Sequence, residues 1–402
     1  MIELTAGFMP LTDSAILLAA SEMGFAEDEG IVLHLVRESS WANMRDRLAI
    51  GHFDIAHALA PMPIAANLGL TPFESHLIAP MALGLGGNAI TVSNDVASAM
   101  HAHHTFEIAD AGGAGKALHH VVTERKSAGE RRLKFGVVHP HSVHNYELRY
   151  WLAASGIKPD QDIDIVVLPP QLMADTLAAG QVDGYCVGEP WNTVAVRRGV
   201  GAIATVKSAI WASSPEKVLA MRTDWAEENQ DLVTALLRAL HRSSVWCGDP
   251  KNVAALATLM ARSDYLDQKV AVIEPALSSS ILDGVRLASG LRFFEPHAAA
   301  ATFPWQSHAL WLYTQMVRAG HVERRPEHTE VVRNSFRPDI YRAALTPMHV
   351  AVPAANSKVE GGLTQTTAVG VSSQSLFLGP DGFFDGRIFD PDQIDAYLDN
   401  GL

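Results

Sequence analysis

Short apolar runs alternate with amphipathic stretches through the first half of the chain. Continuous or alternating apolar runs are typical of strands, whereas apolar residues spaced about 3.6 apart indicate helices. We expect strands at Ile2–Phe8, Ile31–Val36, Asp54–Ala58, Ala89–Val92, Leu133–Val138, Ile163–Leu168, Gly184–Val187, Gly201–Thr205 and Val218–Arg222. Such alternation of strands and helices predicts α/β sheets joined by right-handed crossovers.

Capping residues and glycines mark the helices expected between these strands. The helix expected at Trp41–Ile50 follows Ser39 and Ser40 and stops at Gly51, which is a usual pattern of N-cap and C-terminal glycine. Further helices are expected at Asp13–Glu22, Asn145–Ser155 and Met173–Gly180, and helices should dominate from Thr223 to about Leu345. The segment Asn94–Gly129 is either a helical excursion with a loop or a lobe-specific insertion.

The order of these elements predicts two lobes. The chain leaves a first unit near Asn94 and returns to it, so we expect residues 1–93 plus 207–402 to form one lobe and residues 94–206 the other. A cleft between two lobes is a preferred place for a small ligand, and hinge bending would close it. The tail from Ala351, rich in Gly, Ser, Thr and Pro, should run as an extended segment over the surface.

Composition narrows the possible partners. The chain has 402 residues, 48% hydrophobic and 19% charged, with 31 basic and 44 acidic side chains and a net charge of −13. Phosphates would be repelled over most of such a surface, so we expect no direct nucleic-acid partner and no membrane insertion. A buried pocket could still bind an anion locally. Cys186 and Cys247 are expected as buried thiols, with one disulfide as the alternative.

The N-terminal residues carry no export pattern. The sequence begins as a strand, without a basic segment followed by an apolar run and a cleavage site. We therefore expect a cytoplasmic protein, or a periplasmic one if a signal peptide has been removed. The charge-free stretch Ile55–Phe73 contains Pro61 and Pro63 and is expected to be buried loop and helix rather than a membrane span.

Several motifs occur in one order and together resemble a known family, the nitrate-binding solute receptors of ABC transporters (NrtA-type). They are GFMPLTDSA at 7–15, SSWANMRDRLAIG at 39–51, HALAPMPIA at 57–65, GGNAITVS at 86–93, RYWLAASGIKP at 149–159, VDGYCVGEPWN at 182–192, SPEKVLAMRTDW at 214–225, FPWQSHALW at 303–311 and FRPDIYRAA at 336–344. The resemblance covers nearly the whole chain. It implies an α/β, two-lobed periplasmic-binding-protein fold (type II) with the ligand cleft between the lobes.

The resemblance also implies the ligand-binding residues. In this family a planar anion is held by a Trp, a Gln, a His and a Lys, which fall on Trp41, Asn88, His144 and Lys217. Asn88 departs from the pattern, because this chain has GGNAI where members of the family often have NGQAI. The shorter amide arm is expected to alter the pocket and the preference between nitrate, nitrite and bicarbonate. Each residue alone has an ordinary structural explanation, and only their joint placement indicates a site.

The chemistry of nitrate suits these residue types. Nitrate is a flat monoanion that needs donors around its plane, one positive charge and a wall against its face. Lys217 supplies the charge, Asn88 and His144 supply N–H donors, with His144 expected to bind better when protonated, and Trp41 supplies an indole N–H and a flat face. Helix starts after Pro10 and Ser40 would add backbone donors. Bicarbonate would also need an acceptor, for which Glu189 and Glu216 are candidates.

The expected cytoplasmic location selects one branch of the family. It implies a NasS-type nitrate/nitrite sensor, which controls an RNA-binding antitermination partner of the NasT type by a ligand-driven shift between two forms. The alternative is the substrate-binding component of a nitrate or bicarbonate ABC transporter. Neither function uses a cofactor or catalytic residues, and we expect no enzyme activity.

Enzyme and metal readings stay open as lesser alternatives. Eight of the 18 histidines lie between 101 and 144, and His-x-His spacing can bind a divalent metal, although we expect them to be scattered and solvated. Thiamine-pyrimidine synthases share the fold but use a cysteine-rich motif that is missing here. His144 and Glu147 could form an acid–base pair. Gly112–Gly115 lacks the spacing of a phosphate-binding loop.

Overall fold

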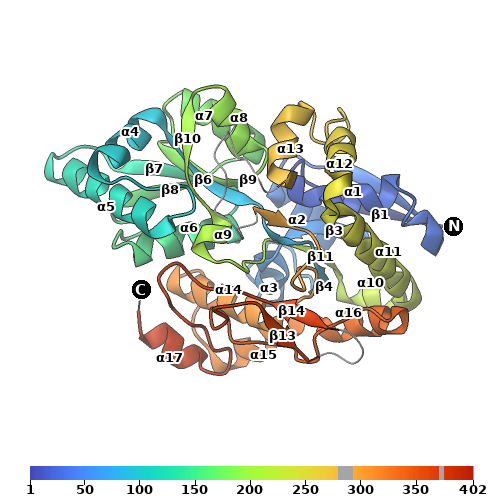
Figure 1. The fold of residues 1–402 in the computed structure, drawn as a ribbon. Coiled ribbons are helices and arrows are strands. Elements are labelled where there is room, and N and C mark those ends of the chain that lie inside the picture. Colours follow the sequence, from blue (N-terminus) through green and yellow to red (C-terminus); the bar gives the residue numbers. More distant parts are fainter. Residues whose placement is uncertain (279–292, 371–374, 402) are drawn as a thin grey trace.

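Two five-stranded sheets form the framework of the computed structural model, which describes residues 1–278, 293–370 and 375–401 (Figure 1). The strand order is β2-β1-β3-β11-β4 in the first sheet and β10-β6-β9-β7-β8 in the second. The first sheet contains β1 (Ile2–Phe8), β2 (Ile31–Arg37), β3 (Ile55–Leu59), β4 (Leu77–Ala82) and β11 (Lys217–Arg222). The second contains β6 (Asn88–Ser93), β7 (Leu133–Val137), β8 (Ile163–Val167), β9 (Gly184–Gly188) and β10 (Gly201–Val206).

The nine expected strands are present within a residue or two of their predicted bounds, and among the strands of these two sheets the sequence prediction missed β4. In the first sheet β1 pairs parallel with β2 and β3, and β11 runs antiparallel between β3 and β4. The pairing of β4 with β11 shifts register between Leu219 and Met221. Pro80, which has no N–H to donate to a ladder, lies within β4 and obscures its strand pattern in the sequence.

The strand at 88–93 belongs to the second sheet. The prediction that residues 89–92 complete the first unit is wrong, because β6 pairs antiparallel with β9 and β10. The chain therefore enters the second sheet just before Asn88. The lobe ranges 1–93 plus 207–402 and 94–206 stay a prediction, and the strand pairing favours moving the first boundary to about residue 87.

Helices surround both sheets (Figure 1). Their bounds are α1 Ala15–Glu22, α2 Trp41–Ala49, α3 Pro61–Asn67, α4 Asn94–His103, α5 Ala111–Ser127, α6 Val143–Ala154, α7 Met173–Ala178, α8 Trp191–Arg197, α9 Lys207–Ile210, α10 Thr223–Glu228, α11 Gln230–Gly248, α12 Val253–Met260, α13 Val270–Ser278, α14 Gln306–Arg318, α15 Pro326–Ser335, α16 Pro338–Leu345 and α17 Ile394–Asp399. Residues 279–292 of the range expected to be helical lie outside the described residues.

The segment 94–129 is a helical excursion formed by α4 and α5. Gly112–Gly115 lies inside α5 rather than in a phosphate-binding loop. Gly115 sits where a Cβ would collide with the side chain of Ser155, so it allows α5 to approach α6. Trp151 of α6 donates its indole N–H to the carbonyl of Ala111 at 2.8 Å.

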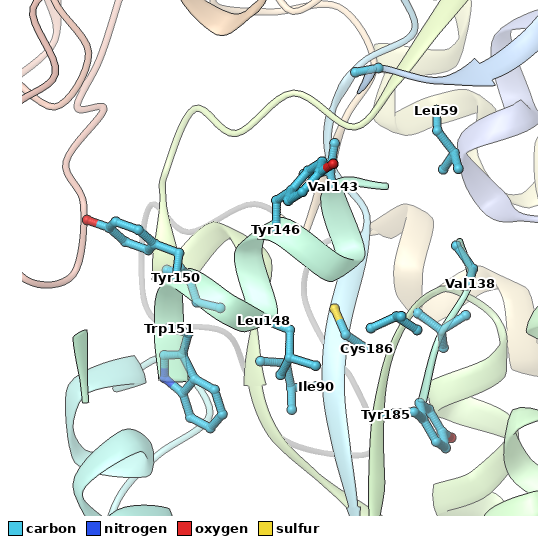
Figure 2. Close-up of a cluster of buried hydrophobic side chains, with 14 of the residues drawn as sticks. Leu59, Ile90, Val138, Val143, Tyr146, Leu148, Tyr150, Trp151, Tyr185 and Cys186 are labelled. Atoms are coloured by element: carbon cyan, nitrogen blue, oxygen red, sulfur yellow. The ribbon is translucent and has the colours of Figure 1, made fainter. Parts of the chain in front are cut away.

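Apolar side chains of α6 seal the second sheet. Figure 2 shows Leu148 of α6 beside Ile90 of β6, with Cys186 of β9 nearby, and all three are buried. Cys186 and Cys247 are both buried free thiols, as predicted. This packing fixes α6 against the strands, and so fixes the residues at its N-terminal end.

The C-terminal part of the chain joins the rest of the molecule together. Helix α14 contacts both α3 and α6, and the tail that follows contains the short strands β13 (Thr367–Val369) and β14 (Leu376–Leu378). The tail, expected as an extended segment over the surface, makes specific contacts with the rest of the molecule. Phe383 stacks on Trp211 with ring centroids 4.7 Å apart, and the N–H of Phe384 donates to the carbonyl of Ile210 at 2.9 Å. The tail thus holds the segment that includes α9.

Candidate functional site

The structure brings the four predicted residues to one buried cluster. Trp41, Asn88, His144 and Lys217 come from α2, β6, α6 and β11, and each is at most 1% exposed. Three of them surround the carboxylate of Glu216. Asn88 Nδ2 donates to Glu216 Oε2 at 2.6 Å, Lys217 Nζ donates to Oε1 at 2.8 Å, and His144 Nδ1 lies 3.2 Å from Oε1. Residues from both sheets therefore meet at one point.

The Trp41 ring forms one wall of the cluster. Lys217 Nζ lies 5.3 Å from the centroid of this ring, within the range of a cation–π contact. The indole Nε1 is buried and has no hydrogen-bond partner among the described residues. A buried donor of this kind is costly to leave unpaired, so it remains available to a ligand.

Serine caps position two of the four side chains. Ser40 Oγ accepts from the N–H of Asn43 at 3.1 Å and starts α2 at Trp41. Ser142 Oγ accepts from the N–H of Asn145 at 3.0 Å and starts α6 one residue before His144. The N-terminal turns of two helices thus flank the cluster, and their dipoles favour a negative charge there.

A glycine turn positions Asn88. Gly86 and Gly87 have φ values of 77° and 94°, in the left-handed region that glycine adopts without steric cost. A Cβ on Gly86 would collide with the carbonyl oxygen of Phe293. The GGN motif therefore lets the backbone turn sharply into β6, with Asn88 as its first residue.

Asp13 and His57 extend the cluster beyond Lys217. Lys217 Nζ donates to Asp13 Oδ2 at 2.7 Å, and His57 Nε2 lies 3.1 Å from Asp13 Oδ1. Burial alone would raise the pKa of Asp13, but Lys217 and His57 outweigh it and hold the pKa below its ordinary value. Burial lowers the pKa of His57, and its Nδ1 accepts from the N–H of Met9, so the neutral ring donates through Nε2.

Lys207, Glu147 and Ser214 extend it on the other side. Lys207 Nζ donates to Glu216 Oε2 at 2.5 Å and to the carbonyl of Pro215 at 2.7 Å, and lies 3.4 Å from Glu147 Oε2. Ser214 Oγ donates to Glu147 Oε1. Burial raises the pKa of Glu147 to about 7, in spite of the attraction of Lys207 for the ionised carboxylate.

Two carboxylates and two ammonium groups balance at the centre. Burial alone would raise the pKa of Glu216, but His144, Lys207 and Lys217 lower it to about 2. Asp13 and Glu216 are therefore ionised and are matched by Lys207 and Lys217. Burial lowers the pKa of His144 to about 3. The ring is therefore neutral at neutral pH, and the stronger anion binding expected of a protonated His144 is not available there.

The two carboxylates considered as acceptors for bicarbonate lie in different places. Glu216 is at the centre of the cluster. Glu189 lies just before α8, where its Oε2 accepts from the N–H of Thr193 at 3.2 Å, and burial raises its pKa to about 7. Of the two, Glu216 is the one that contacts the predicted ligand residues.

Sequence reasoning assigned no ligand-site role to Asp13, His57 or Lys207. Asp13 appeared only as the first residue of the expected helix Asp13–Glu22 and within a motif, and His57 only within a buried stretch and a motif. Lys207 carries a recognisable signal, because it follows the apolar strand Gly201–Val206 and precedes Ala209 and Ile210. A lysine enclosed by apolar neighbours is rarely buried unless a carboxylate pairs with it.

In the part of the chain that the structure describes, which includes the histidine-rich segment, no group of three or more His, Cys, Asp or Glu side chains is placed to hold a metal. His101 stacks on Phe106 with centroids 4.5 Å apart, and His103 Nε2 lies 2.9 Å from Glu124. His139 and His144 are buried, so the prediction of solvated histidines is wrong for these two.

The side chains of the cluster are buried. One pocket of about 390 Å³ is lined by residues of α10, α11 and α16 and contains no residue of the cluster. Within the described residues, no helix is long and apolar enough to cross a membrane. Because the side chains of the cluster are buried, we expect the surrounding elements to move apart before a ligand reaches it.

Comparisons with known proteins agree with one another. A model of the NMT1-like family matches residues 2–261. The nitrate/nitrite binding protein NrtA of Synechococcus elongatus is 32% identical over 98% of this chain and 85% of its own length. The bicarbonate transport ATP-binding protein CmpC of Synechocystis is 30% identical over 99% of this chain, which spans 54% of that longer protein.

A solved structure gives the same picture. The periplasmic nitrate-binding protein NrtA from Synechocystis matches with a TM-score of 0.85 and 26% identity, covering 100% of this chain and 99% of that one. The predicted two-lobed type II binding-protein fold is thereby confirmed.

Proposed function

The chain belongs to the NMT1-like family, and on that premise we propose that it binds nitrate or nitrite among Trp41, Asn88, His144 and Lys217. The relatives that support this ligand are the nitrate/nitrite-binding NrtA proteins. The proposed role is binding and release, without turnover.

One observation carries the proposal. The side chains of Asn88, His144 and Lys217 converge on a planar carboxylate, that of Glu216, whose two oxygens they surround. Nitrate and nitrite are likewise planar, negatively charged and rich in acceptor oxygens. A donor set that fits Glu216 has the charge and geometry for such an anion, and the Trp41 ring supplies the wall against its face.

The names of the relatives favour a transport receptor. They include nitrate/nitrite binding proteins and components of nitrate and bicarbonate import. We therefore propose a substrate-binding component of an anion importer ahead of the sensor that the sequence first suggested. The sensor, its antitermination partner and a cytoplasmic location rest on the family resemblance and the N-terminal pattern alone.

Bicarbonate is the second candidate ligand. Unlike nitrate it carries a hydroxyl donor, and Glu216 places an acceptor among the donors of the site. The similarity to bicarbonate transport proteins supports the same candidate.

Isothermal titration with nitrate, nitrite and bicarbonate in chloride-free buffer tests the proposal. We expect heat with nitrate or nitrite, and a loss of about 2–4 kcal/mol of binding free energy in Lys217→Ala, because a buried anion loses its charge partner. Heat with bicarbonate alone would identify bicarbonate, rather than nitrate or nitrite, as the ligand. The absence of heat with all three would refute the proposed function.

A matched control separates lost binding from lost stability. Lys358 is also largely buried and contacts two carboxylates, Glu360 and Asp381, but it lies in the C-terminal tail. Lys358→Ala should destabilise the fold in a similar way and leave nitrate affinity unchanged. Equal losses of affinity in both variants would mean that the site is wrongly placed.

A further inference from the structure

The carboxylate of Glu216 occupies the donors that the proposed anion needs. Oε1 interacts with Lys217 at 2.8 Å and with His144 at 3.2 Å, while Oε2 accepts from Asn88 at 2.6 Å and from Lys207 at 2.5 Å. Three of these four groups are the polar residues assigned to the ligand. Glu216 is therefore an internal ligand of the site, and an incoming anion has to compete with it.

Charge balance limits how that competition can end. Asp13, Glu216, Lys207 and Lys217 together carry no net charge, and all four side chains are buried. A monoanion added without any other change would leave a net negative charge in a dry site, which is unfavourable. Two anionic groups that share one set of donors raise the pKa of the one that can be protonated.

We infer that the anion binds together with one proton, which Glu216 accepts when the anion takes its donors, so that Glu216 determines both affinity and selectivity. This inference rests on the proposed function and adds a residue and a proton to it. In chemical terms, the anion accepts the hydrogen bonds of Asn88, His144 and Lys217, and the displaced carboxylate becomes a neutral carboxylic acid. The proton comes from solvent, and no covalent bond other than this O–H is formed.

The groups that face Glu216 support this assignment. They are His57 of β3, Asn88 of β6, His144 and Glu147 of α6, Cys186 of β9, Lys207 of α9 and Lys217 of β11, and Asp13 before α1 faces its partner Lys217. Asp13 keeps His57 and Lys217 as partners, and these two side chains continue to stabilise its ionised form. Glu147 is the other acid near the centre, and it interacts with Ser214 and Lys207 rather than with the assigned ligand residues.

The consequence is an affinity that depends on pH. In the free protein the pKa of Glu216 lies at about 2, and in the complex it is raised because its donors are gone and its burial remains. Between these two values the complex holds one more proton than the free protein, so affinity falls as pH rises. The limiting slope is about tenfold per pH unit.

The test measures protons as well as heat. Nitrate is the probe, because it does not itself titrate between pH 5 and about 8. The full-length protein is titrated with nitrate in two buffers of different ionisation enthalpy at each pH, which gives the number of protons taken up. We expect close to one proton per nitrate at the acidic end of this range.

Three variants identify the group that accepts the proton. Glu216→Gln should take up no proton, bind nitrate at least about tenfold more tightly at pH 8, and lose its pH dependence, since one unit of pH linkage corresponds to tenfold. Glu147→Gln should retain the proton. Glu360→Gln is the matched control, because Glu360 is another buried carboxylate held by a lysine and a histidine, Lys358 and His308, and it should also retain the proton.

Clear outcomes would overturn the inference. Nitrate binding by the wild-type protein without proton uptake would show that Glu216 leaves the site ionised, while the proposed function would stand. Loss of proton uptake in Glu147→Gln but not in Glu216→Gln would show that Glu147, and not Glu216, accepts the proton. If Glu216→Gln fails to fold, the wild-type count still tests whether a proton is taken up, and the count in Glu147→Gln tests whether Glu147 accepts it. Absence of binding by nitrate, nitrite and bicarbonate would refute the proposed function itself.

Discussion

At the scale of single residues, Lys217 has two tasks. It neutralises Asp13 and Glu216 in the folded protein, at 2.7 and 2.8 Å, and in the proposed function it also binds the anion. Burial opposes its charge, but the two carboxylates outweigh burial and raise its pKa. The lysine is therefore charged before any ligand arrives, and the site needs no reorganisation of charge on this residue.

Glu147 provides a prediction about stability and pH. Its pKa is raised from 4.5 to about 7 in the folded protein, so the folded state holds more of this proton than the unfolded state across that window. Stability therefore falls as pH rises through it, by about 3 kcal/mol in total at 1.36 kcal/mol per pKa unit. Glu147→Gln should remove this fall. Its free energy of unfolding should therefore rise relative to that of the wild type as the pH increases from 4 to 8.

Urea unfolding at several pH values checks this prediction. Glu124→Gln is the control, because Glu124 is largely exposed on α5, and it should follow the wild-type pH profile. If the free energy of unfolding of Glu147→Gln fell with pH as steeply as that of the wild type, Glu147 would not hold a proton in the folded state.

Residue types and motifs located the four ligand candidates, but not their neighbours. Trp41, Asn88, His144 and Lys217 could be named because each lies in a motif with a recognisable order. Asp13, His57 and Lys207 could not, because a charge becomes part of the cluster only through contacts between distant segments, such as the 204 positions that separate Asp13 from Lys217. Sequence patterns report local spacing, and this cluster depends on tertiary pairing.

At the scale of elements, two of the four ligand candidates, Trp41 and His144, lie in the first turns of serine-capped helices, and the other two lie on strands. Ser40 caps α2 next to Trp41, and Ser93 caps α4 by accepting from the N–H of Val96 at 3.3 Å. Each cap satisfies an N–H at a helix start that would otherwise lack a partner.

Removing these two caps should have equal effects on stability and different effects on binding. Ser40→Ala and Ser93→Ala should each lower the free energy of unfolding by about 1 kcal/mol. Only Ser40→Ala should also weaken nitrate binding, by roughly two- to fivefold, because the helix start beside Trp41 loses its order and part of its dipole effect. Chemical unfolding and titration calorimetry measure the two effects, and a loss of affinity in both variants would contradict this explanation.

The elements show which sequence patterns were informative. Strands with regular apolar patterns were predicted closely, as Ile2–Phe8 shows. Leu77–Ala82 was missed because Pro80 argues against a strand, although the ladder accommodates it with a register shift. Asn88–Ser93 was found but placed in the wrong sheet, because strand pairing over long sequence distances leaves no local trace.

At the scale of the whole molecule, the buried cluster requires a movement for ligand entry. Side chains from both sheets enclose it, so under the proposed function we expect the lobes to separate and close again around the ligand. One contact at the edge of this interface is visible. Gln171, in the 3-10 turn Pro170–Leu172 before α7, donates its Nε2 to the carbonyl of Ser39 before α2 at 2.9 Å.

Loss of the Gln171 contact should favour the open form. Gln171→Ala should weaken nitrate binding by roughly three- to tenfold, through an increased rate of dissociation, because it removes one hydrogen bond between the segments before α2 and α7, which we expect to break when the lobes open. Gln230→Ala is the control, since Gln230 donates its side-chain N–H to the carbonyl of Glu227 in the neighbouring helix, far from the cluster. Stopped-flow dissociation measures the rate, and equal rates in the two variants would exclude Gln171 as a closing contact.

The anchoring of Trp211 by Phe383 has a consequence for biosynthesis. Lys207 lies four positions before Trp211, so the segment that supplies the second cation of the site is fixed by residues translated long afterwards. On the ribosome, chains fold from the N-terminus as they emerge. A nascent chain can therefore hold Asp13 and Glu216 before their surroundings are in place. Under the proposed function, tight nitrate binding would report that translation and folding are finished.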